Sequence, residues 1–200
     1  MLNKIYQPLT VLLLLLNGCA TTRIQSVQKS PDFNSAHIRK VLIVAVTSTP
    51  GLRKQVEWEF VKQWKERGVD VVASESVLPL TVTLDKAGIG AFAKTQGFDS
   101  VLVTRLVKRE KIEPQIVRTK GETAPPPADD SNLTQYMGAV VASPEYGMDF
   151  EVAIVSANLY DVPTEMRLWS GTTQTLLTDD VPKRVRAFTQ VILKTIYTPS

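Results

Sequence analysis

Lys40-Val41-Leu42-Ile43-Val44-Ala45-Val46 is the segment that sets the fold class of this 200-residue chain. It is a continuous apolar run rich in β-branched residues, which is typical of a β-strand covered on both faces. A turn over Thr47–Gly51 follows it. The next segment, Leu52 to Arg67, predicts an amphipathic helix, because apolar residues recur there at every fourth position. That apolar stripe consists of Leu52, Val56, Phe60 and Trp64.

The alternation of strand and helix then repeats. Gly68 suits the position after a helix, and Val69–Ala73 predicts a second strand. Leu84 to about Gln96 has helical spacing of apolar residues, and Ser100–Lys108 predicts a third strand. Because crossovers between parallel strands are right-handed, this βαβαβ order predicts a mostly parallel sheet with helices packed on it.

The second half of the chain has a different pattern. The segment 118–144 is polar and contains Pro125-Pro126-Pro127, which predicts a loop insertion. Glu151–Tyr160 and Met166–Leu177 predict a β-hairpin. A final helix follows, with Asp179 or Asp180 as its cap and Pro182 in its first turn; its predicted buried face is Val185, Phe188, Val191, Ile192 and Ile196. We therefore predict an α/β fold, a three-layer or two-layer sandwich, with a βαβαβ parallel start followed by a β-hairpin and a C-terminal helix.

The N-terminus has the features of a secretion signal. Lys4 supplies a positive charge, and the apolar run Leu9–Leu16 is about half of the ~20 residues that a membrane-spanning helix needs. Leu16-Asn17-Gly18-Cys19 resembles the lipobox of bacterial lipoproteins, which implies a diacylglyceryl group on Cys19. Ala20 follows Cys19, and by the same resemblance this favours the outer membrane. The alternative is an ordinary signal peptide, or an uncleaved anchor, with a chance cysteine.

These features predict three regions along the chain. Residues 1–18 are the signal peptide, residues 19–38 are the lipidated N-terminus with a flexible tether, and residues 39–198 are a single α/β domain. The tether prediction rests on the polar composition from Thr21 to about Ala36, and a random coil of that length would reach on the order of 20–25 Å.

Several core and turn segments resemble one group of envelope proteins. These segments are Lys40–Val46, Lys65–Val69, Gly97–Val103 and the hairpin from Leu159 to Gly171. They are similar to the amino-terminal domain of the Tol-system protein TolB and to lipoproteins of the same core, namely LpoB, PelC and CsgG. The resemblance implies a protein-binding accessory or an assembly component without catalytic activity, and it transfers no functional residue. The prolines of the 118–144 insertion disfavour the membrane-spanning hairpins of a CsgG-type pore.

The sequence predicts no catalytic residue, metal site or cofactor. Cys19 is the single cysteine and His37 the single histidine, which disfavours thiol chemistry, a zinc site and a catalytic triad. Asp129-Asp130 and Asp179-Asp180 are interpreted as turn residues or helix caps. The net charge of +3 includes Lys4 of the signal, so the mature chain is barely basic and nucleic acid is not expected as a partner.

Two sets of residues are candidates for partner binding. Tyr136, Met137 and Tyr146 lie in or beside the insertion, where exposed aromatic residues suit protein recognition and folding back over the sheet is the alternative. Lys183, Arg184 and Arg186 lie in the first turns of the last helix. They are either tolerated surface charge or a basic patch for an acidic partner or an anionic lipid.

The combined prediction is a periplasm-facing lipoprotein anchored in the outer membrane, which acts as a non-catalytic protein-binding or scaffold module of the cell envelope. Its membrane contact is the N-terminal lipid, and its protein partner is not identified by the sequence. One alternative is a subunit of an oligomeric secretion or assembly complex, including a homo-oligomer. A second alternative is a cell-wall or lipid hydrolase, which would need a cleft with perturbed carboxylates.

Overall fold

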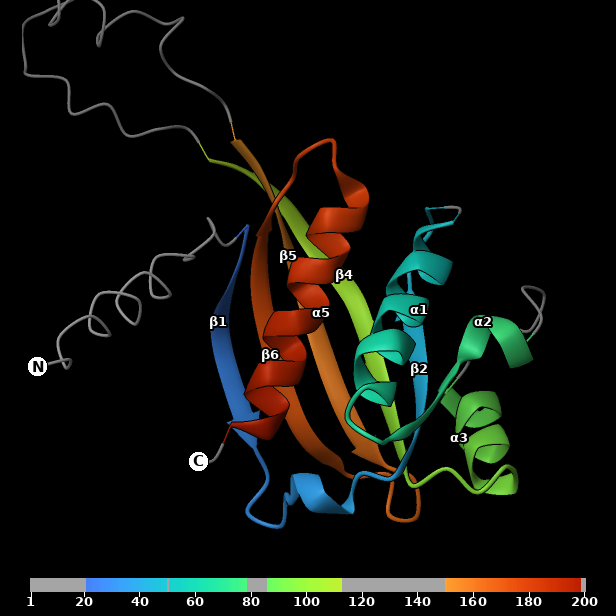
Figure 1. The fold of residues 1–200 in the computed structure, drawn as a ribbon. Coiled ribbons are helices and arrows are strands. Elements are labelled where there is room, and N and C mark those ends of the chain that lie inside the picture. The colour runs from blue at the N-terminus through green and yellow to red at the C-terminus, as the bar shows by residue number, and fades with distance from the viewer. Residues whose placement is uncertain (1–20, 50, 79–85, 113–149, 199–200) are drawn as a thin grey trace, which may run out of the picture.

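The computed structural model describes residues 21–49, 51–78, 86–112 and 150–198, and within them six strands form one mixed sheet (Figure 1). The order across the sheet is β1-β6-β5-β4-β2-β3. The strands are β1 (Thr22–Lys29), β2 (Lys40–Val46), β3 (Asp70–Ala73), β4 (Ser100–Ile112), β5 (Phe150–Asp161) and β6 (Arg167–Leu176).

The parallel part of the sheet is the predicted βαβαβ unit. β2 pairs in parallel with both β3 and β4, with Val41 opposite Val71 on one side and Ser100 on the other. β5 and β6 then form the predicted antiparallel hairpin, and β5 also pairs antiparallel with β4. The predicted fold class is confirmed.

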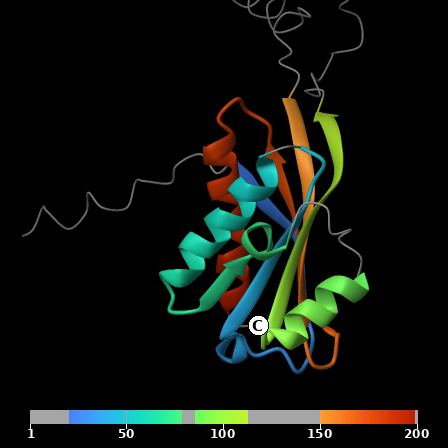
Figure 2. The same cartoon turned by 90° about the vertical axis from the view of Figure 1, so that its right-hand side faces the viewer.

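Helices cover both faces of the parallel part of the sheet. α1 (Leu52–Lys65) and α5 (Val181–Tyr197) lie on one face, and α3 (Lys86–Thr95) lies on the other (Figure 2). Two short helices complete the described structure: α2 (Ser74–Val77) and the 3₁₀ helix η1 (Ser35–His37). The arrangement is three-layered around β2 and β4 and two-layered over β6 and β1, so both predicted forms of the sandwich occur.

Alternate residues of the buried strands supply two apolar cores. Val41 and Ile43 of β2 belong to the larger core under α1 and α5, whereas Leu42 and Val44 belong to the smaller core under α3. This alternation is the reason why the run Lys40–Val46 contains no polar residue between its ends. The large fully buried side chains of the first core are Phe60, Trp64, Leu102, Leu159, Trp169, Ile192, Leu193 and Ile196.

The ends of the two long helices follow the predicted signals. The Asp180 side chain caps α5 by accepting a hydrogen bond from the Lys183 backbone N–H at 2.9 Å, and Pro182 lies in the first turn. After α1, Gly68 adopts a φ of +78°, a left-handed conformation that glycine tolerates without strain. The chain can therefore turn directly from α1 into β3.

The predicted flexible tether over residues 19–38 is wrong for its described part. Residues Thr22–Lys29 form β1, which pairs antiparallel with β6 from Thr22 opposite Thr175 to Lys29 opposite Trp169. β1 is an edge strand, and six of its consecutive positions are exposed. Because the strand buries little, its residues can be polar. The free edge of β6 supplies its hydrogen bonds, which the composition of β1 alone does not reveal.

Several predictions lie outside the described residues. These are the signal peptide 1–18, the lipid-attachment residue Cys19, the insertion 118–144, and the candidate residues Tyr136, Met137 and Tyr146.

Candidate functional site

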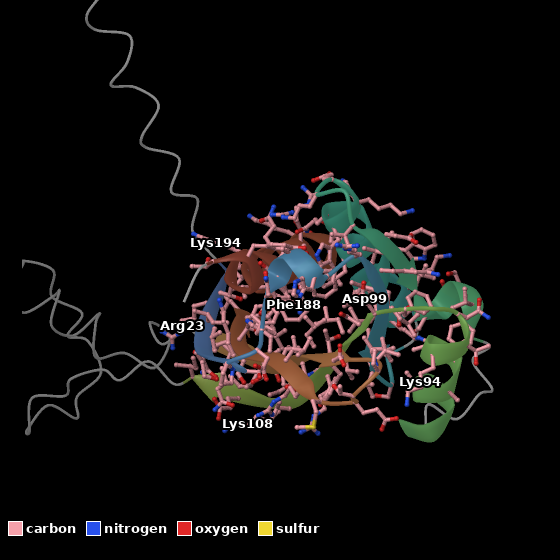
Figure 3. The ribbon with its side chains drawn as sticks, turned by 90° about the horizontal axis from the view of Figure 1, so that it is seen from below. Arg23, Lys94, Asp99, Lys108, Phe188 and Lys194 are labelled. Carbon is pink, nitrogen blue, oxygen red and sulfur yellow. The ribbon has the colours of Figure 1, made fainter. Side chains whose placement is uncertain are left out.

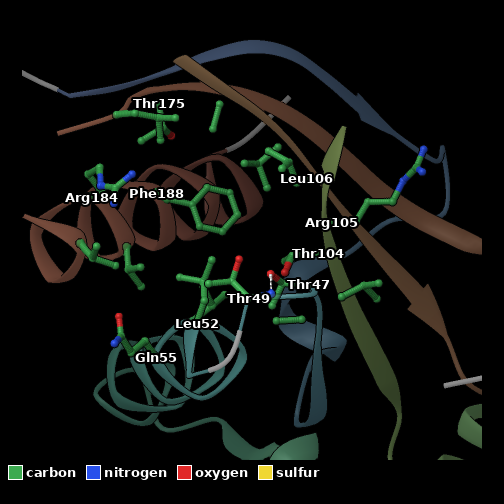
Figure 4. A pocket seen from close by; sticks show the side chains of 18 of the residues that line it. Thr47, Thr49, Leu52, Gln55, Thr104, Arg105, Leu106, Thr175, Arg184 and Phe188 are labelled. Atoms are coloured by element: carbon green, nitrogen blue, oxygen red, sulfur yellow. Dashed lines mark hydrogen bonds between the residues drawn. The ribbon is translucent and has the colours of Figure 1, made fainter. Parts of the chain in front are cut away.

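A cleft of about 590 Å³ lies between α1 and α5, over the sheet face that both helices cover (Figure 4). It is at the end of the molecule where both helices begin and where the parallel strands β2 and β4 have their carboxyl ends. Clefts of about 300–1,000 Å³ are typical of small-molecule sites. This cleft is therefore the candidate functional site of the described chain.

The walls of the cleft are mostly apolar. Leu52 and Val56 of α1 face Val185 and Phe188 of α5, while strands β4 and β5 form the floor. Beyond Phe188 the helices close on each other, because the rings of Phe60 and Phe188 meet edge to face with centroids 5.7 Å apart. Figure 3 shows Phe188 in the interior of the molecule, whereas Lys108 and Lys194 lie at the periphery.

The cleft changes the interpretation of the α1 stripe. The sequence predicts four buried residues, and Phe60 and Trp64 are fully buried. Leu52 and Val56 are only half-buried and line the cleft. The stripe thus serves two purposes: its C-terminal half packs in the core, and its N-terminal half forms an open apolar wall.

Threonine side chains from three elements line the polar part of the cleft. Thr47 and Thr49 lie in the turn after β2, where the Thr49 backbone N–H donates to Thr47 Oγ1 at 3.1 Å (Figure 4). Thr104 of β4 and Thr175 of β6 complete the set. Thr175 Oγ1 is 3.0 Å from Thr22 Oγ1, so the cleft adjoins the first residues of β1.

The charge of the cleft is positive. Arg184 of α5 and Arg109 of β4 line it, and none of the described lining residues is acidic. The Nε of Arg184 is buried and has no hydrogen-bond partner among the described residues. Arg105 borders the cleft as well, but its side chain points away from Phe188 (Figure 4). The cleft therefore offers two guanidinium groups to an anionic group.

The three predicted basic residues of the last helix occupy different positions. Arg184 lines the cleft, whereas Lys183 is exposed outside it. The Nε of Arg186 is 3.9 Å from Glu59 Oε1 on α1, a loose ion pair in which the arginine side chain is exposed and the glutamate side chain is mostly buried. Their role in partner binding stays a prediction, but the structure brings only Arg184 of the three into the cleft.

Sequence reasoning missed a second polar site beside the cleft, centred on the fully buried Glu57. Its Oε1 accepts hydrogen bonds from Arg53 Nε at 3.1 Å, Ser74 Oγ at 2.7 Å and the Ala45 backbone N–H at 2.9 Å. Its Oε2 accepts from the Glu75 backbone N–H at 2.7 Å. These bonds join α1 to β2 and α2. The sequence signal was the Arg53–Glu57 spacing of four residues on one helix, which is typical of an ion pair.

The described residues show no catalytic constellation. They contain no group of three or more His, Cys, Asp and Glu side chains that could hold a metal ion. His37 is exposed in η1. Within the same residues no helix has the length and apolarity to cross a membrane.

No family model and no curated protein match this sequence. Among solved structures, the chain is similar to the PelC dodecamer from Paraburkholderia phytofirmans, with a TM-score of 0.50 and 12% identity over 90% of this chain and 99% of that chain. It is also similar to the lipoprotein GNA1162 from Neisseria meningitidis, with a TM-score of 0.40 and 13% identity over 79% of this chain and 97% of that chain. The likeness to PelC shows the fold, and it confirms the predicted structural resemblance to PelC.

Proposed function

We propose that this protein is a lipid-anchored component of the outer membrane that faces the periplasm and acts as a non-catalytic binding or scaffold module. The observation that carries the proposal is the likeness to PelC over nearly the whole of both chains. The lipobox-like segment ending in Cys19 supports the anchor independently of the fold. Lipid attachment confines a protein to one surface and so raises its effective concentration for membrane-bound partners.

The position of β1 supports a domain held close to the membrane. The carbonyl of Thr21 accepts a hydrogen bond from the Leu176 backbone N–H at 2.7 Å, so the ordered sheet begins two residues after Cys19. Two residues span at most about 7 Å. A lipid on Cys19 therefore places the end of the domain where β1 begins directly at the membrane surface.

The state of the described carboxylates supports a non-catalytic role. Glu57 is buried, but all of its hydrogen bonds are to groups of its own fold. Asp99 is partly buried: its Oδ2 accepts hydrogen bonds from the Arg39 and Lys40 backbone N–H groups, and its Oδ1 is buried without a partner among the described residues. It precedes the amino end of β4 and does not line the cleft. A hydrolase of cell-wall or lipid substrates would need a carboxylate in the cleft, and none of the described cleft residues is acidic.

The test of the anchor is the mass of the purified full-length protein and its distribution between membrane and soluble fractions. We expect the N-terminal peptide to begin at Cys19 with bound acyl chains, and the Cys19→Ala variant to leave the outer-membrane fraction. An unmodified Cys19 in membrane-extracted protein would contradict the proposal.

The test of the binding role is crosslinking in cells followed by affinity capture, with the Cys19→Ala variant beside the wild type. We expect the same envelope proteins to be captured repeatedly with the wild type and lost with the variant. Capture of nothing but unrelated abundant proteins would remove the support for a binding module and reopen the hydrolase alternative.

A second candidate function is a subunit of a homo-oligomer. The observation that favours it is that the PelC structure is a dodecamer. Trp58 on α1 is 45% exposed, and its indole N–H donates to Glu75 Oε2 at 3.3 Å beside the edge strand β3. An exposed tryptophan near a sheet edge is suited to a contact between copies.

Native mass spectrometry of the detergent-extracted protein tests this second candidate. We expect one closed oligomer of defined size, which the Trp58→Ala variant weakens and the nearby Lys54→Ala variant does not. A monomer at all concentrations would exclude it and leave the scaffold proposal intact.

A further inference from the structure

We propose that the cleft between α1 and α5 binds an anionic phospholipid of the membrane in which the chain is anchored. The proposal rests on the anchoring through Cys19 proposed above and names a ligand for the candidate site. Three features of the described residues support it: the place where the chain leaves the sheet, the apolar walls of the cleft, and its unpaired positive charge.

The first feature is position. Thr175 lines the cleft and is hydrogen-bonded through its hydroxyl to Thr22, the first residue of β1. Cys19 is two residues before Thr21, so its Cα lies within about 7 Å of that of Thr21. An acyl anchor on Cys19 therefore brings the lipid headgroups to the end of the domain at which the cleft is located.

The second feature is the apolar wall. Leu52, Val56, Val185 and Phe188 face one another across the cleft, and Leu106 of β4 adds a side chain that is 43% exposed. Removing apolar surface from water stabilises a complex by roughly 25 cal/mol per Å². A ligand that enters between these side chains must itself be apolar over part of its length, as an acyl chain is.

The third feature is the charge. Arg184 and Arg109 line the cleft, and none of the described lining residues is acidic. The Nε of Arg184 is buried without a hydrogen-bond partner among the described residues. A guanidinium group binds phosphate oxygens in a planar, bidentate geometry. A phosphodiester at this position would supply the acceptor that Arg184 Nε lacks, while the acyl chains lie along the apolar walls.

The combination selects a phospholipid over other anions. A soluble phosphate would use the arginines and leave the apolar walls in water. An acidic peptide would place polar backbone groups against the apolar side chains of Phe188 and Val185, which offer no hydrogen-bond partner; the threonines of the lining lie on the turn after β2 and on the strands. A lipid with a negatively charged headgroup matches both the arginines and the walls, and it is present at the end of the domain where the anchor holds it.

The experiment uses the full-length lipidated protein in non-ionic detergent, with native mass spectrometry after addition of palmitoyl-oleoyl phosphatidylglycerol or phosphatidylcholine. We expect one phosphatidylglycerol per chain, bound about tenfold or more tightly than phosphatidylcholine. Both lipids carry the phosphodiester, but the choline cation of phosphatidylcholine would lie beside Arg109 and Arg184 in a cleft whose described lining has no acidic residue. The double variant Arg109→Gln/Arg184→Gln should lose this preference, and Leu106→Gln should weaken the binding of both lipids.

Arg105→Gln is the matched control, because Arg105 borders the cleft with its side chain pointing away from it. It removes one of the same charges and should keep the preference for phosphatidylglycerol. If Arg105→Gln lost the preference for phosphatidylglycerol as fully as the double variant does, the lipid would be attracted by the general surface charge, and the proposal would be overturned. The thermal midpoints of all variants establish that each is folded.

Three further outcomes would also overturn it. Equal binding of both lipids would exclude recognition of the anionic headgroup. Displacement of the lipid by millimolar inorganic phosphate would indicate a soluble anion as the ligand. Binding to the Cys19→Ala variant but not to the lipidated protein would show that the chain's own acyl groups fill the cleft. Because binding is measured in detergent, an unmodified Cys19 would contradict the anchor without deciding the lipid result.

Discussion

Two polar neighbourhoods on either side of α1 differ in whether their charges are paired. On one side, the buried Glu57 accepts four hydrogen bonds from its own fold. On the other side, Arg184 has a buried Nε without a described partner, at the wall of the cleft. Ala45 belongs to both, since its N–H donates to Glu57 and the residue also lines the cleft.

The difference separates a structural charge from a charge available to a ligand. A buried charge whose hydrogen bonds are all made fixes the elements around it, and here it fixes α1, β2 and the start of α2. A buried donor without a partner costs free energy that a bound group can recover. We therefore expect mutations in the Glu57 network to change stability and mutations in the cleft to change binding.

The largest expected effect is that of Glu57→Gln. The substitution keeps the shape of the side chain but leaves the buried Arg53 guanidinium without its carboxylate, and it presents an amide donor to backbone N–H groups. Breaking a buried ion pair typically costs about 3–5 kcal/mol. Urea unfolding measures the loss. Glu66→Gln, at the exposed C-terminal end of the same helix, should change the free energy of unfolding by less than about 0.5 kcal/mol. Equal effects would contradict the structural role of Glu57.

A second prediction compares two alanines on the same face of β5. Ala157 is fully buried opposite Gly171, and Trp169 packs so closely over Gly171 that a Cβ there would lie 2.4 Å from the indole ring. Ala157→Leu should therefore cost about 1–3 kcal/mol by overpacking. Ala153 lines the cleft, where Ala153→Leu has open space and should change stability by no more than about 0.5 kcal/mol. Thermal denaturation of both variants checks this difference, and equal destabilisation would mean that the cleft is closed in solution.

A third prediction concerns the core end of α1. Trp64 is fully buried, and its indole N–H donates to the Tyr197 hydroxyl at 2.7 Å. Tyr197→Phe leaves that N–H without an acceptor and should cost about 1–3 kcal/mol near neutral pH.

The same residue gives a pH dependence. Burial raises the pKa of Tyr197 above its ordinary value of 10.0, more than the hydrogen bond from Trp64 and the charge of Arg67 lower it. The folded state therefore binds this proton more tightly than the unfolded state. Its contribution to stability is complete below pH 10 and is lost as the pH rises through the folded-state pKa. The stability difference between wild type and Tyr197→Phe should shrink above pH 10 in urea titrations, and a constant difference would contradict the assignment.

The parallel half of the fold was predictable from the sequence because its periodicity is strong. The apolar run Lys40–Val46, the α1 stripe and the Asp180 cap all correspond to observed elements, with ends shifted by one or two residues.

β1 was missed for a physical reason. An edge strand buries little, so the composition of Thr22–Lys29 carries no apolar alternation, and only the edge of β6 makes it a strand.

The cleft could be predicted only in part. The apolar positions Leu52, Val56, Val185 and Phe188 were recognised as one face of each helix, but periodicity does not show where two helices diverge. Arg109 is 75 residues before Arg184 in the chain, and only the pairing of β4 with β5 under α5 brings both to one cleft. Among the three basic residues of the last helix, the sequence could not distinguish Arg184 from Lys183.

The smallest expected effect on stability is that of Arg184→Gln. This variant tests the comparison between the paired charge of Glu57 and the unpaired Nε of Arg184 most directly. The buried Nε of Arg184 makes no hydrogen bond to a described residue. Removing this nitrogen therefore breaks no hydrogen bond of the described fold. We expect the free energy of unfolding to change by less than about 0.5 kcal/mol, in contrast to Glu57→Gln. Urea unfolding in detergent without added lipid measures it, and adding phosphatidylglycerol should then stabilise the wild type more than the variant. A large loss of stability without lipid would mean that Arg184, like Glu57, is held by its own fold, and the cleft would lose its unpaired charge.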